Sequence, residues 1–276
     1  MKVTLITACY NSEATIRTAI ESVLSQKGVD VEYIVVDGGS KDGTVNIIKE
    51  YAAKTNDQRL ATNDFTFRWL SERDRGMYDA INKGIAMATA DIIGILNADD
   101  VLASNDTLAK IAAQFEVTGN GEQGTEKIDA VYADIRFVRT GDSLETLRVA
   151  KTVRYCSAAK WRPWMFRFAA MVPHPSFYVR RECFDQLGGY SLDYKICADF
   201  ELELRFLKLA KLKAVYLPEC VVVMRMGGAS TSGWKSNKKI NEEDLKALRT
   251  HGIWSCLPLI YLKYLFKIWG FIFKRR

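Results

Sequence analysis

Acidic and small polar residues follow four short apolar runs within the first hundred residues. The runs at 3–8, 33–36, 67–70 and 92–96 end in Cys9-Tyr10-Asn11, Asp37-Gly38-Gly39-Ser40, Glu72-Arg73-Asp74 and Asn97-Ala98-Asp99-Asp100. In an open parallel sheet, ligands bind at the carboxyl ends of the strands. If the four runs are neighbouring parallel strands, carboxylates from three loops meet at one edge.

The adjacent carboxylates of Asp99 and Asp100 predict a cation site. Two carboxylates after a buried strand repel each other unless a cation or hydrogen bonds offset the repulsion. Hard divalent ions such as Mg²⁺ or Mn²⁺ prefer carboxylate oxygens. The alternative is that one of the two residues caps the next helix.

No glycine-rich phosphate loop is present. The first run is not followed by GxGxxG, and GxxxxGK[ST] does not occur. A loop that carries a carboxylate, as at Asp37, suits recognition of a base or ribose better than of phosphate. The pattern therefore predicts a nucleotide whose diphosphate is held by a metal ion.

The elements that position these residues alternate between strands and helices. Amphipathic segments at 13–26, 43–54 and 77–89 separate the apolar runs, which predicts an α/β fold with a mostly parallel sheet flanked by helices. Further on we expect helices at 104–116, 198–212 and 239–250, a strand at 130–138, and two short strands within 214–224.

Composition and charge restrict the class of protein. With 276 residues, 48% of them hydrophobic, the chain suits one large globular domain. The net charge is +6, but residues 235–276 hold ten Lys or Arg against three acids, so the basic character belongs to the C-terminal segment and favours anionic lipid over nucleic acid. No signal peptide or zinc-type cysteine spacing is visible, and we expect a cytoplasmic location.

The C-terminal segment combines aromatic residues with lysines. Residues 253–276 carry seven aromatic side chains and end in Lys274-Arg275-Arg276, which predicts an amphipathic interfacial helix; a helix packed on the body or on a dimer partner is the alternative. Residues 146–181 hold eight basic residues and no acid. That stretch has two interpretations. It could bind a lipid-linked pyrophosphate acceptor, or it could be a solvated basic face whose tryptophans lie in the core.

Four motifs, in order and spacing, resemble glycosyltransferase family 2 over the first 230 residues or so. They are Thr7-Ala8-Cys9-Tyr10-Asn11, Val35-Val36-Asp37-Gly38-Gly39-Ser40-Lys41-Asp42-Gly43-Thr44, Asp74-Arg75-Gly76-Met77-Tyr78-Asp79-Ala80-Ile81-Asn82-Lys83-Gly84 and Leu96-Asn97-Ala98-Asp99-Asp100. The resemblance implies a GT-A fold and an inverting transfer of a sugar from a nucleotide diphosphate donor to an acceptor hydroxyl.

The resemblance also implies roles for single residues. Asp37 would contact the base or ribose, Asp74 would help to hold the nucleotide, and Asp99 with Asp100 would form the Mg²⁺ or Mn²⁺ site. The nucleotide-sugar-binding set implied in this way is Thr7, Tyr10, Asn11, Asp37, Asp74, Asn82 and Asp99.

The general base is expected on a later helix. Residues 196–205 resemble the family motif whose Asp takes the acceptor proton, which makes Asp199 the candidate; capping of its helix is the other interpretation. We expect Glu201 and Glu203 to be solvated. His174, between two prolines, could meet the diphosphate or metal or could be structural, and His251 has no predicted chemical role.

Two positions depart from the family pattern. Many members have a second Asp where this chain has Gly38, and an Arg where it has Ile81. These two differences weaken the prediction, implied by the resemblance, that the protein recognises uracil. A UDP-sugar is favoured only because it is the family's commonest type of donor, and GDP-sugars and dTDP-sugars are the alternatives.

These observations combine into one predicted organisation. Residues 1–234 form a GT-A domain, with a nucleotide-sugar half at 1–103 and an acceptor half at 128–234, and 235–276 form a membrane-associating tail. The predicted function is metal-dependent transfer of a hexosyl or N-acetylhexosaminyl group to a lipid-linked glycan of the cell surface, at the inner face of the plasma membrane. The alternative is a non-catalytic nucleotide-sugar-binding protein at the membrane.

Overall fold

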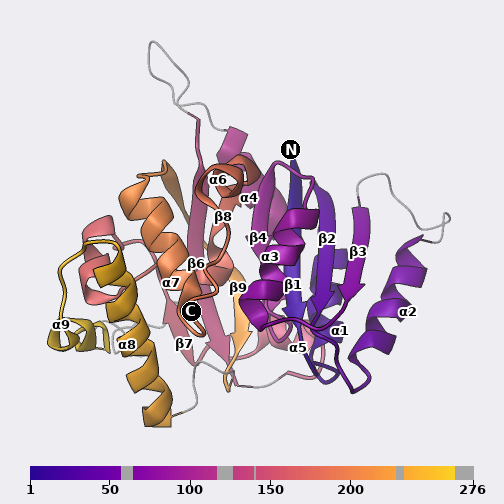
Figure 1. Ribbon diagram of the computed structural model, residues 1–276. Coiled ribbons are helices and arrows are strands. Elements are labelled where there is room, and N and C mark those ends of the chain that lie inside the picture. The colour runs from indigo at the N-terminus through magenta and orange to yellow at the C-terminus, as the bar shows by residue number, and fades with distance from the viewer. Residues whose placement is uncertain (57–64, 117–126, 140, 228–232, 265–276) are drawn as a thin grey trace, which may run out of the picture.

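A nine-stranded mixed sheet runs through the computed structural model, in which residues 1–56, 65–116, 127–139, 141–227 and 233–264 are described. Its strand order is β3-β2-β1-β4-β8-β6-β9-β5, with β7 paired to β6 (Figure 1). Two large apolar clusters cover its faces. One contains residues of α3, α6 and α7, and the other contains residues of α1, α2 and α4.

The first half is a parallel sheet with helical crossovers. Successive residues of each strand point to opposite faces, so Leu5 enters one apolar cluster and Ile6 the other. The elements are β1 (Lys2–Cys9), α1 (Ile16–Leu24), β2 (Asp30–Asp37), α2 (Thr44–Asn56), β3 (Phe65–Ser71), α3 (Met77–Met87) and β4 (Ile92–Ile95). The strands pair in the order β3-β2-β1-β4, all parallel, so their carboxyl ends share one edge (Figure 1).

The second half adds antiparallel pairs. β8 lies between β4 and β6 and is antiparallel to both. The elements are β5 (Val101–Leu102), α4 (Thr107–Glu116), β6 (Ala130–Val138), α5 (Leu144–Val149), β7 (Arg154–Cys156), η1 (Pro163–Phe168), η2 (His174–Ser176), β8 (Tyr178–Arg180), α6 (Arg181–Leu187), α7 (Ala198–Glu203), η3 (Leu204–Leu209) and β9 (Ala214–Arg225).

Two sequence-based expectations need correction here. The helix expected at 198–212 begins as α7 and continues as the π-helical η3. The two short strands expected within 214–224 are one strand, β9, whose pairing with β6 shifts between Leu217 and Cys220. Pro218 lies in that bulge, where its missing N–H breaks no ladder hydrogen bond.

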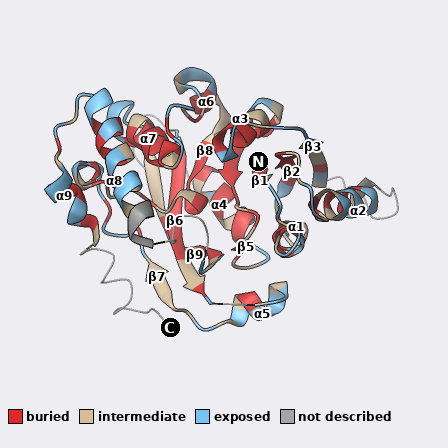
Figure 2. Ribbon diagram, turned by 60° about the horizontal axis from the view of Figure 1, so that its bottom comes forward, coloured by how far each residue is buried: buried red, intermediate tan, exposed pale blue. Residues whose placement is uncertain are grey.

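The C-terminal helices α8 (Gly233–Thr250) and α9 (Leu257–Tyr261) pack on the body. Ala247 and Leu248 of α8 and Ile260 of α9 are fully buried (Figure 2). Lys263 Nζ lies 2.5 Å from Asp244 Oδ2, and both side chains are buried. The described part of the expected tail thus follows the alternative of a packed helix, while 265–276 lie outside the described residues. No helix among the described residues is long and apolar enough to cross a membrane.

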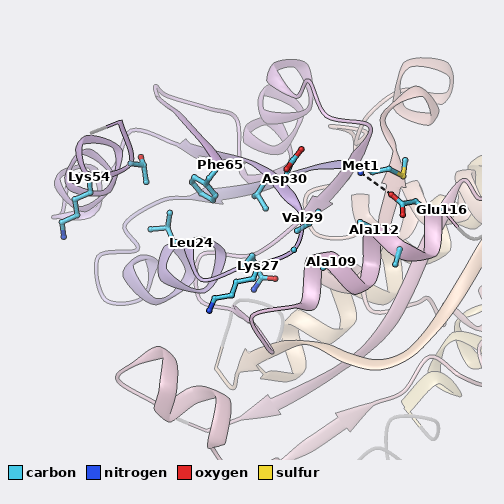
Figure 3. Close-up of a pocket in the computed structure, with 15 residues that line it drawn as sticks. Met1, Leu24, Lys27, Val29, Asp30, Lys54, Phe65, Ala109, Ala112 and Glu116 are labelled. Carbon is cyan, nitrogen blue, oxygen red and sulfur yellow. Dashed lines mark hydrogen bonds and ion pairs between the residues drawn. The ribbon is translucent and has the colours of Figure 1, made fainter. Parts of the chain in front are cut away.

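A cavity of about 860 Å³ opens at the amino ends of the first strands (Figure 3). Met1, Asp30 and Phe65, at the starts of β1, β2 and β3, line it together with Ala109 and Ala112 of α4. It lies at the sheet edge opposite the acidic loops, so it is separate from the site predicted from the sequence.

Candidate active site

The loops after β1 and β2 are joined by hydrogen bonds. The N–H of Asn11 donates to Ser40 Oγ at 2.8 Å, and the N–H of Lys41 donates to Asn11 Oδ1 at 2.9 Å. Asn11 has a left-handed backbone with φ of 49°, which Asn tolerates better than most residues. The preceding Tyr10 is 57% exposed, so its ring is available to a ligand.

The carboxylate of Asp37 is used to hold its own loop. Its Oδ2 accepts hydrogen bonds from the N–H groups of Gly39 and Ser40 and from Ser71 Oγ, at 3.1, 3.0 and 2.7 Å. Its Oδ1 accepts from Ser40 Oγ, and the residue is fully buried. These hydrogen bonds fix the shape of the loop, and the expected contact of Asp37 with base or ribose stays a prediction.

Asp74 lies over Gly38. A Cβ atom at Gly38 would stand 2.4 Å from Asp74 Oδ2, closer than real atoms approach. Asp74 Oδ1 accepts from the N–H of Gly76 at 2.9 Å, and the side chain is half-buried. The glycine that departs from the family pattern thus leaves room for the carboxylate of Asp74.

Asp99 and Asp100 lie in different environments. Asp100 is fully buried; its Oδ2 accepts from Asn97 Nδ2 at 2.8 Å, but its Oδ1 has no hydrogen-bond partner. Burial and the charge of Asp99 raise the pKa of Asp100 well above its usual range. Asp99 is half-buried, and within the described ranges its backbone oxygen, not its carboxylate, is hydrogen-bonded.

Arg225, at the end of β9, lies beside this pair. Its guanidinium donates to the backbone oxygen of Asp99 and, at 2.9 Å, to Thr18 Oγ1. Burial lowers the pKa of Arg225, opposed by the charges of Asp99 and Asp100. The guanidinium makes its hydrogen bonds to other groups. Against the larger effect of burial, both the guanidinium charge and the backbone N–H of Arg225 act to lower the pKa of Asp100.

A divalent cation fits the two carboxylates. A buried carboxylate oxygen without a partner costs free energy, and Mg²⁺ or Mn²⁺ would supply that partner. The described residues contain no group of three or more His, Cys, Asp or Glu side chains that could hold a metal ion. Asp99 and Asp100 would therefore hold the ion together with waters or the oxygens of a bound phosphate.

Asp199 lies in the first turn of α7. Its Oδ1 accepts from the N–H of Phe200 at 2.9 Å. The single proton of Tyr78 Oη is shared between Asp199 Oδ1 at 3.1 Å and the backbone oxygen of Ile196, which is closer at 2.5 Å. The residue at the N-cap is Cys197, so the alternative of a capping aspartate is wrong. Tyr78 belongs to the first turn of α3, directly after the Asp74 loop, and it therefore connects Asp199 to that loop.

Tyr190 binds two of the predicted site residues. The side-chain amide of Asn82 accepts from its N–H and donates to its C=O, both at 2.8 Å. His174 Nε2 lies 2.6 Å from its hydroxyl, and burial lowers the pKa of His174. Asn82 and His174 thus hold the Tyr190 segment, and their expected contacts with the nucleotide and with the diphosphate or metal stay predictions.

Thr7 is a residue of the core. It is fully buried in β1, and its Oγ1 accepts from Tyr33 Oη at 3.0 Å. This side chain supports the strand from within, and the expected contact of Thr7 with the nucleotide stays a prediction.

The expected solvation of Glu201 and Glu203 is wrong. Glu201 Oε1 lies 3.0 Å from Arg205 Nε and 2.8 Å from His251 Nε2, so His251 also has a partner. Glu203 is fully buried: its Oε2 accepts from the N–H of Val172 at 3.1 Å, and its Oε1 has no partner. The two side chains are two positions apart and so lie on different sides of α7. Glu201 meets Arg205 and His251, whereas Glu203 meets the segment at Val172, and both are buried by contacts distant in sequence.

Glu203→Gln is expected to stabilise the protein at neutral pH. Burial, with the charge of Asp199, raises the pKa of Glu203 well above its usual value of 4.5. Between the two pKa values the native state binds one more proton than the unfolded state, so the stability of the wild type falls by about 1.4 kcal/mol per pH unit as pH rises. Urea unfolding should show a gain for the variant that is largest at neutral pH and vanishes toward pH 4.5. A difference that does not vary with pH, or the same gain in the exposed control Glu145→Gln, would contradict this assignment.

One sheet edge thus gathers Tyr10, Asn11, Asp74, Asp99 and Asp100, with Asp199 connected to it by Tyr78. Within the described residues, no hydrogen bond or ion pair joins Asp199 to Asp99 or Asp100. The sequence analysis missed Tyr78, Tyr190 and Arg225. Tyr78 lies inside a recognised motif, whereas the position of Arg225 depends on the long-range pairing of β9 with β6.

Comparison with known proteins gives a consistent result. Residues 4–124 match the family model described as glycosyl transferase family 2. A Mycobacterium bovis protein named PGL/p-HBAD biosynthesis glycosyltransferase is 27% identical over 244 residues, which cover 88% of this chain and 82% of that protein. A Mycobacterium tuberculosis protein named as an uncharacterized glycosyltransferase is 28% identical over 211 residues, 74% of this chain and 68% of its own.

Solved structures share the fold. The mannosyltransferase PcManGT from Pyrobaculum calidifontis, in complex with GDP-Man and Mn²⁺, has a TM-score of 0.61 at 20% identity, over 98% of this chain and 72% of that chain. Residues 1–349 of TarS from Staphylococcus aureus, in complex with UDP-GlcNAc, have a TM-score of 0.60 at 15% identity, over 90% of this chain and 66% of that one. The expected α/β architecture of GT-A type is thereby confirmed.

Proposed function

Since the chain belongs to glycosyltransferase family 2, we propose that it catalyses an inverting, metal-dependent transfer of a sugar from a nucleotide diphosphate to an acceptor hydroxyl. One observation carries this proposal: Oδ1 of Asp100 is buried and has no hydrogen-bond partner. The neighbouring residue, Asp99, supplies a second carboxylate. A cation bound there would lie at the edge where Tyr10 and Asp74 are available to a nucleotide.

The donor is held by side chains that the fold leaves available. Tyr10 offers an exposed ring to the base, and Asn11 and Asp74 offer polar groups to the nucleoside, while Asp37 fixes the loop between them. When bound at Asp99 and Asp100, Mg²⁺ or Mn²⁺ would offset the charge that develops on the departing diphosphate.

Asp199 is proposed as the general base. Inversion requires a group on the face opposite the leaving group that takes the acceptor proton as the hydroxyl attacks. The Oδ1 atom of Asp199 is fixed by Tyr78 and by the backbone of α7, and no hydrogen bond to another described residue involves its Oδ2. Oδ2 is therefore the atom that we assign to proton transfer.

Tyr78→Phe is expected to lower kcat about tenfold with little change in KM for the donor. The variant removes the hydroxyl that donates both to the backbone oxygen of Ile196 and to Asp199 Oδ1, so the segment before α7 and the carboxylate itself are held less firmly. A tenfold loss corresponds to about 1.4 kcal/mol. Steady-state kinetics separate the two parameters. A change in donor KM at constant kcat would contradict the positioning role, and Tyr194→Phe, on the loop before α7, serves as the control.

Gly38→Ala is expected to weaken donor binding about tenfold, because its Cβ would displace the carboxylate of Asp74. Calorimetric titration with the donor nucleotide measures the effect. If displacement of Asp74 is the cause, the same substitution should have no further effect in an Asp74→Ala background. Equal effects in both backgrounds would show that Gly38 acts on its own.

The donor is proposed to be a UDP-sugar that delivers a hexosyl or N-acetylhexosaminyl group. TarS was solved with UDP and with UDP-GlcNAc, which supports this choice, whereas PcManGT was solved with GDP-Man and Mn²⁺ and keeps the GDP-sugar as the competitor. Many family members have an Asp and an Arg, which could recognise the base, at the positions of Gly38 and Ile81. This chain lacks both side chains, so binding must be measured for each nucleotide.

The acceptor is proposed to be a lipid-linked glycan at the inner face of the plasma membrane, with the enzyme as a peripheral protein. The name of the mycobacterial relative, which refers to PGL/p-HBAD biosynthesis, and the basic aromatic C-terminal segment support this proposal. The division into a donor half at 1–103, an acceptor half at 128–234 and a segment at 235–276 remains a prediction.

A binding panel tests the donor and the metal together. The full chain is titrated with UDP, GDP and dTDP and with their sugars, each with Mn²⁺ and with EDTA. Tight binding of one nucleotide that requires the metal supports the proposal. Binding of a nucleotide sugar without turnover on any lipid-linked or soluble acceptor would favour the non-catalytic alternative.

A further inference from the structure

Large apolar side chains are exposed together at the end of the molecule formed by η1, η3 and α9. Trp164 is 58% exposed and Trp254 is 69% exposed. We call this surface the η1–α9 face and define it by Trp164, Leu209, Trp254, Leu257, Tyr261 and Leu262. In Figure 1, α9 lies at the end of the molecule opposite α2.

The three segments of this face are held together by direct contacts. η1 packs against both α9 and η3. Ser255 Oγ donates to the backbone oxygen of Arg167 at 2.7 Å, which fixes the start of α9 on η1. The rings of Trp164 and Phe168 meet edge to face at 5.9 Å. The face is therefore one ordered surface built from sequence positions almost a hundred residues apart.

A cavity of about 360 Å³ lies within this region, and its lining is mostly apolar. Two cations, Arg167 and Lys208, are among its lining residues. The others are Pro163, Trp164, Phe166, Phe168 and Ile253. An apolar recess with cations beside it matches the chemistry of an acyl chain that carries an anionic headgroup.

The stretches of sequence that build the face are basic. Residues 146–181, 204–218 and 245–264 contain no Asp or Glu and hold fifteen of the 39 Lys and Arg residues. Of the acids of α8, which packs on α9, Asp244 is buried and paired with Lys263. η1, η3 and α9 all belong to these three acid-free stretches. A protein partner would need a strongly acidic surface to complement these basic stretches. A bilayer with anionic lipids offers negatively charged headgroups together with an apolar interior.

We propose that the η1–α9 face docks on the surface of a bilayer that contains anionic phospholipid. Trp164, Trp254 and Tyr261 would lie at the headgroup level, where amphipathic aromatic rings are enriched, and Arg167 and Lys208 would meet phosphate. The inference goes beyond the expected C-terminal tail, because η1 and η3 belong to the proposed acceptor half. It depends on the packing of α9 against η1 and is independent of the transfer reaction.

Vesicle sedimentation of the full chain tests the docking. The vesicles are phosphatidylcholine alone, and phosphatidylcholine mixed with phosphatidylglycerol, without nucleotide. Binding is expected only with phosphatidylglycerol, and Trp164→Ala and Lys208→Glu are each expected to weaken it about tenfold or more. Val149→Ala and Lys49→Glu, which alter an exposed apolar residue of α5 and an exposed lysine of α2, are the matched controls.

The outcomes separate this inference from the proposed reaction. Circular dichroism verifies that each variant is folded, and Asp199→Asn should bind vesicles as the wild type does. Wild-type binding that Trp164→Ala leaves unchanged would overturn the inference and leave the C-terminal segment alone responsible. Absence of binding to phosphatidylglycerol, or a wild-type dimer in gel filtration that Trp164→Ala dissociates, would also overturn it, the latter in favour of a second copy on this face.

Discussion

Asp199→Asn is expected to lower kcat for sugar transfer about 1,000-fold while donor affinity stays within a factor of about two. The amide keeps the size of the side chain and can still accept from Tyr78 and from the N–H of Phe200. It cannot take the proton of the acceptor hydroxyl. Because the donor is proposed to bind at Asp74, Asp99 and Asp100, removal of the base leaves the binding groups in place.

Transfer kinetics and donor titration with the same preparation measure the two effects. Asp193→Asn changes an exposed carboxylate six residues earlier and is the matched control. A variant that keeps more than about a tenth of the wild-type kcat would remove Asp199 from the role of base. A parallel loss of donor affinity would instead place Asp199 in the donor site.

Asp99→Asn and Asp100→Asn are each expected to abolish the increase in donor affinity that Mn²⁺ provides. The wild type should bind a UDP-sugar at least 100-fold more tightly with Mn²⁺ than with EDTA, which corresponds to about 2.7 kcal/mol. Each variant replaces one of only two carboxylates proposed to hold the ion. Affinity measured in EDTA should change little, because the nucleoside contacts remain.

The control for these variants is Asp91→Asn, an exposed carboxylate just before β4 at the opposite end of the same strand. Calorimetry with Mn²⁺ alone should show weak binding, because ions held by two carboxylates need the diphosphate to complete their ligands. Tight binding of Mn²⁺ alone, or a variant that keeps the full metal effect, would contradict the assignment of the site.

The sheet edge was predictable because the first four strands and the helices between them could be recognised from local patterns. The runs before Asp37 and Asp99 are apolar and end at acids, and parallel pairing with helical crossovers brings such ends together. Asp199 was identified only by resemblance to a family motif. Its hydrogen bond to Tyr78 joins residues 121 positions apart, which no local pattern reports.

Sequence spacing does not show the direction of a side chain or its hydrogen-bond partners. Thr7 and Asn82 lie inside recognised motifs, but their polar atoms are taken by Tyr33 and by the backbone of Tyr190. Glu203 has the sequence pattern of a solvated helix residue, yet tertiary packing buries it without a partner for one oxygen. The family resemblance thus names candidate residues, and the structure adds the partners that each of them has.

The most direct test of the proposed activity is transfer of a radiolabelled sugar from its nucleotide to a membrane lipid extract by the full chain. We expect a labelled lipid product with Mn²⁺, none with EDTA, and about 1,000-fold less with Asp199→Asn. Label transferred equally in EDTA would contradict a metal-dependent transfer, and label transferred by Asp199→Asn at the wild-type rate would contradict the assignment of Asp199 as the base.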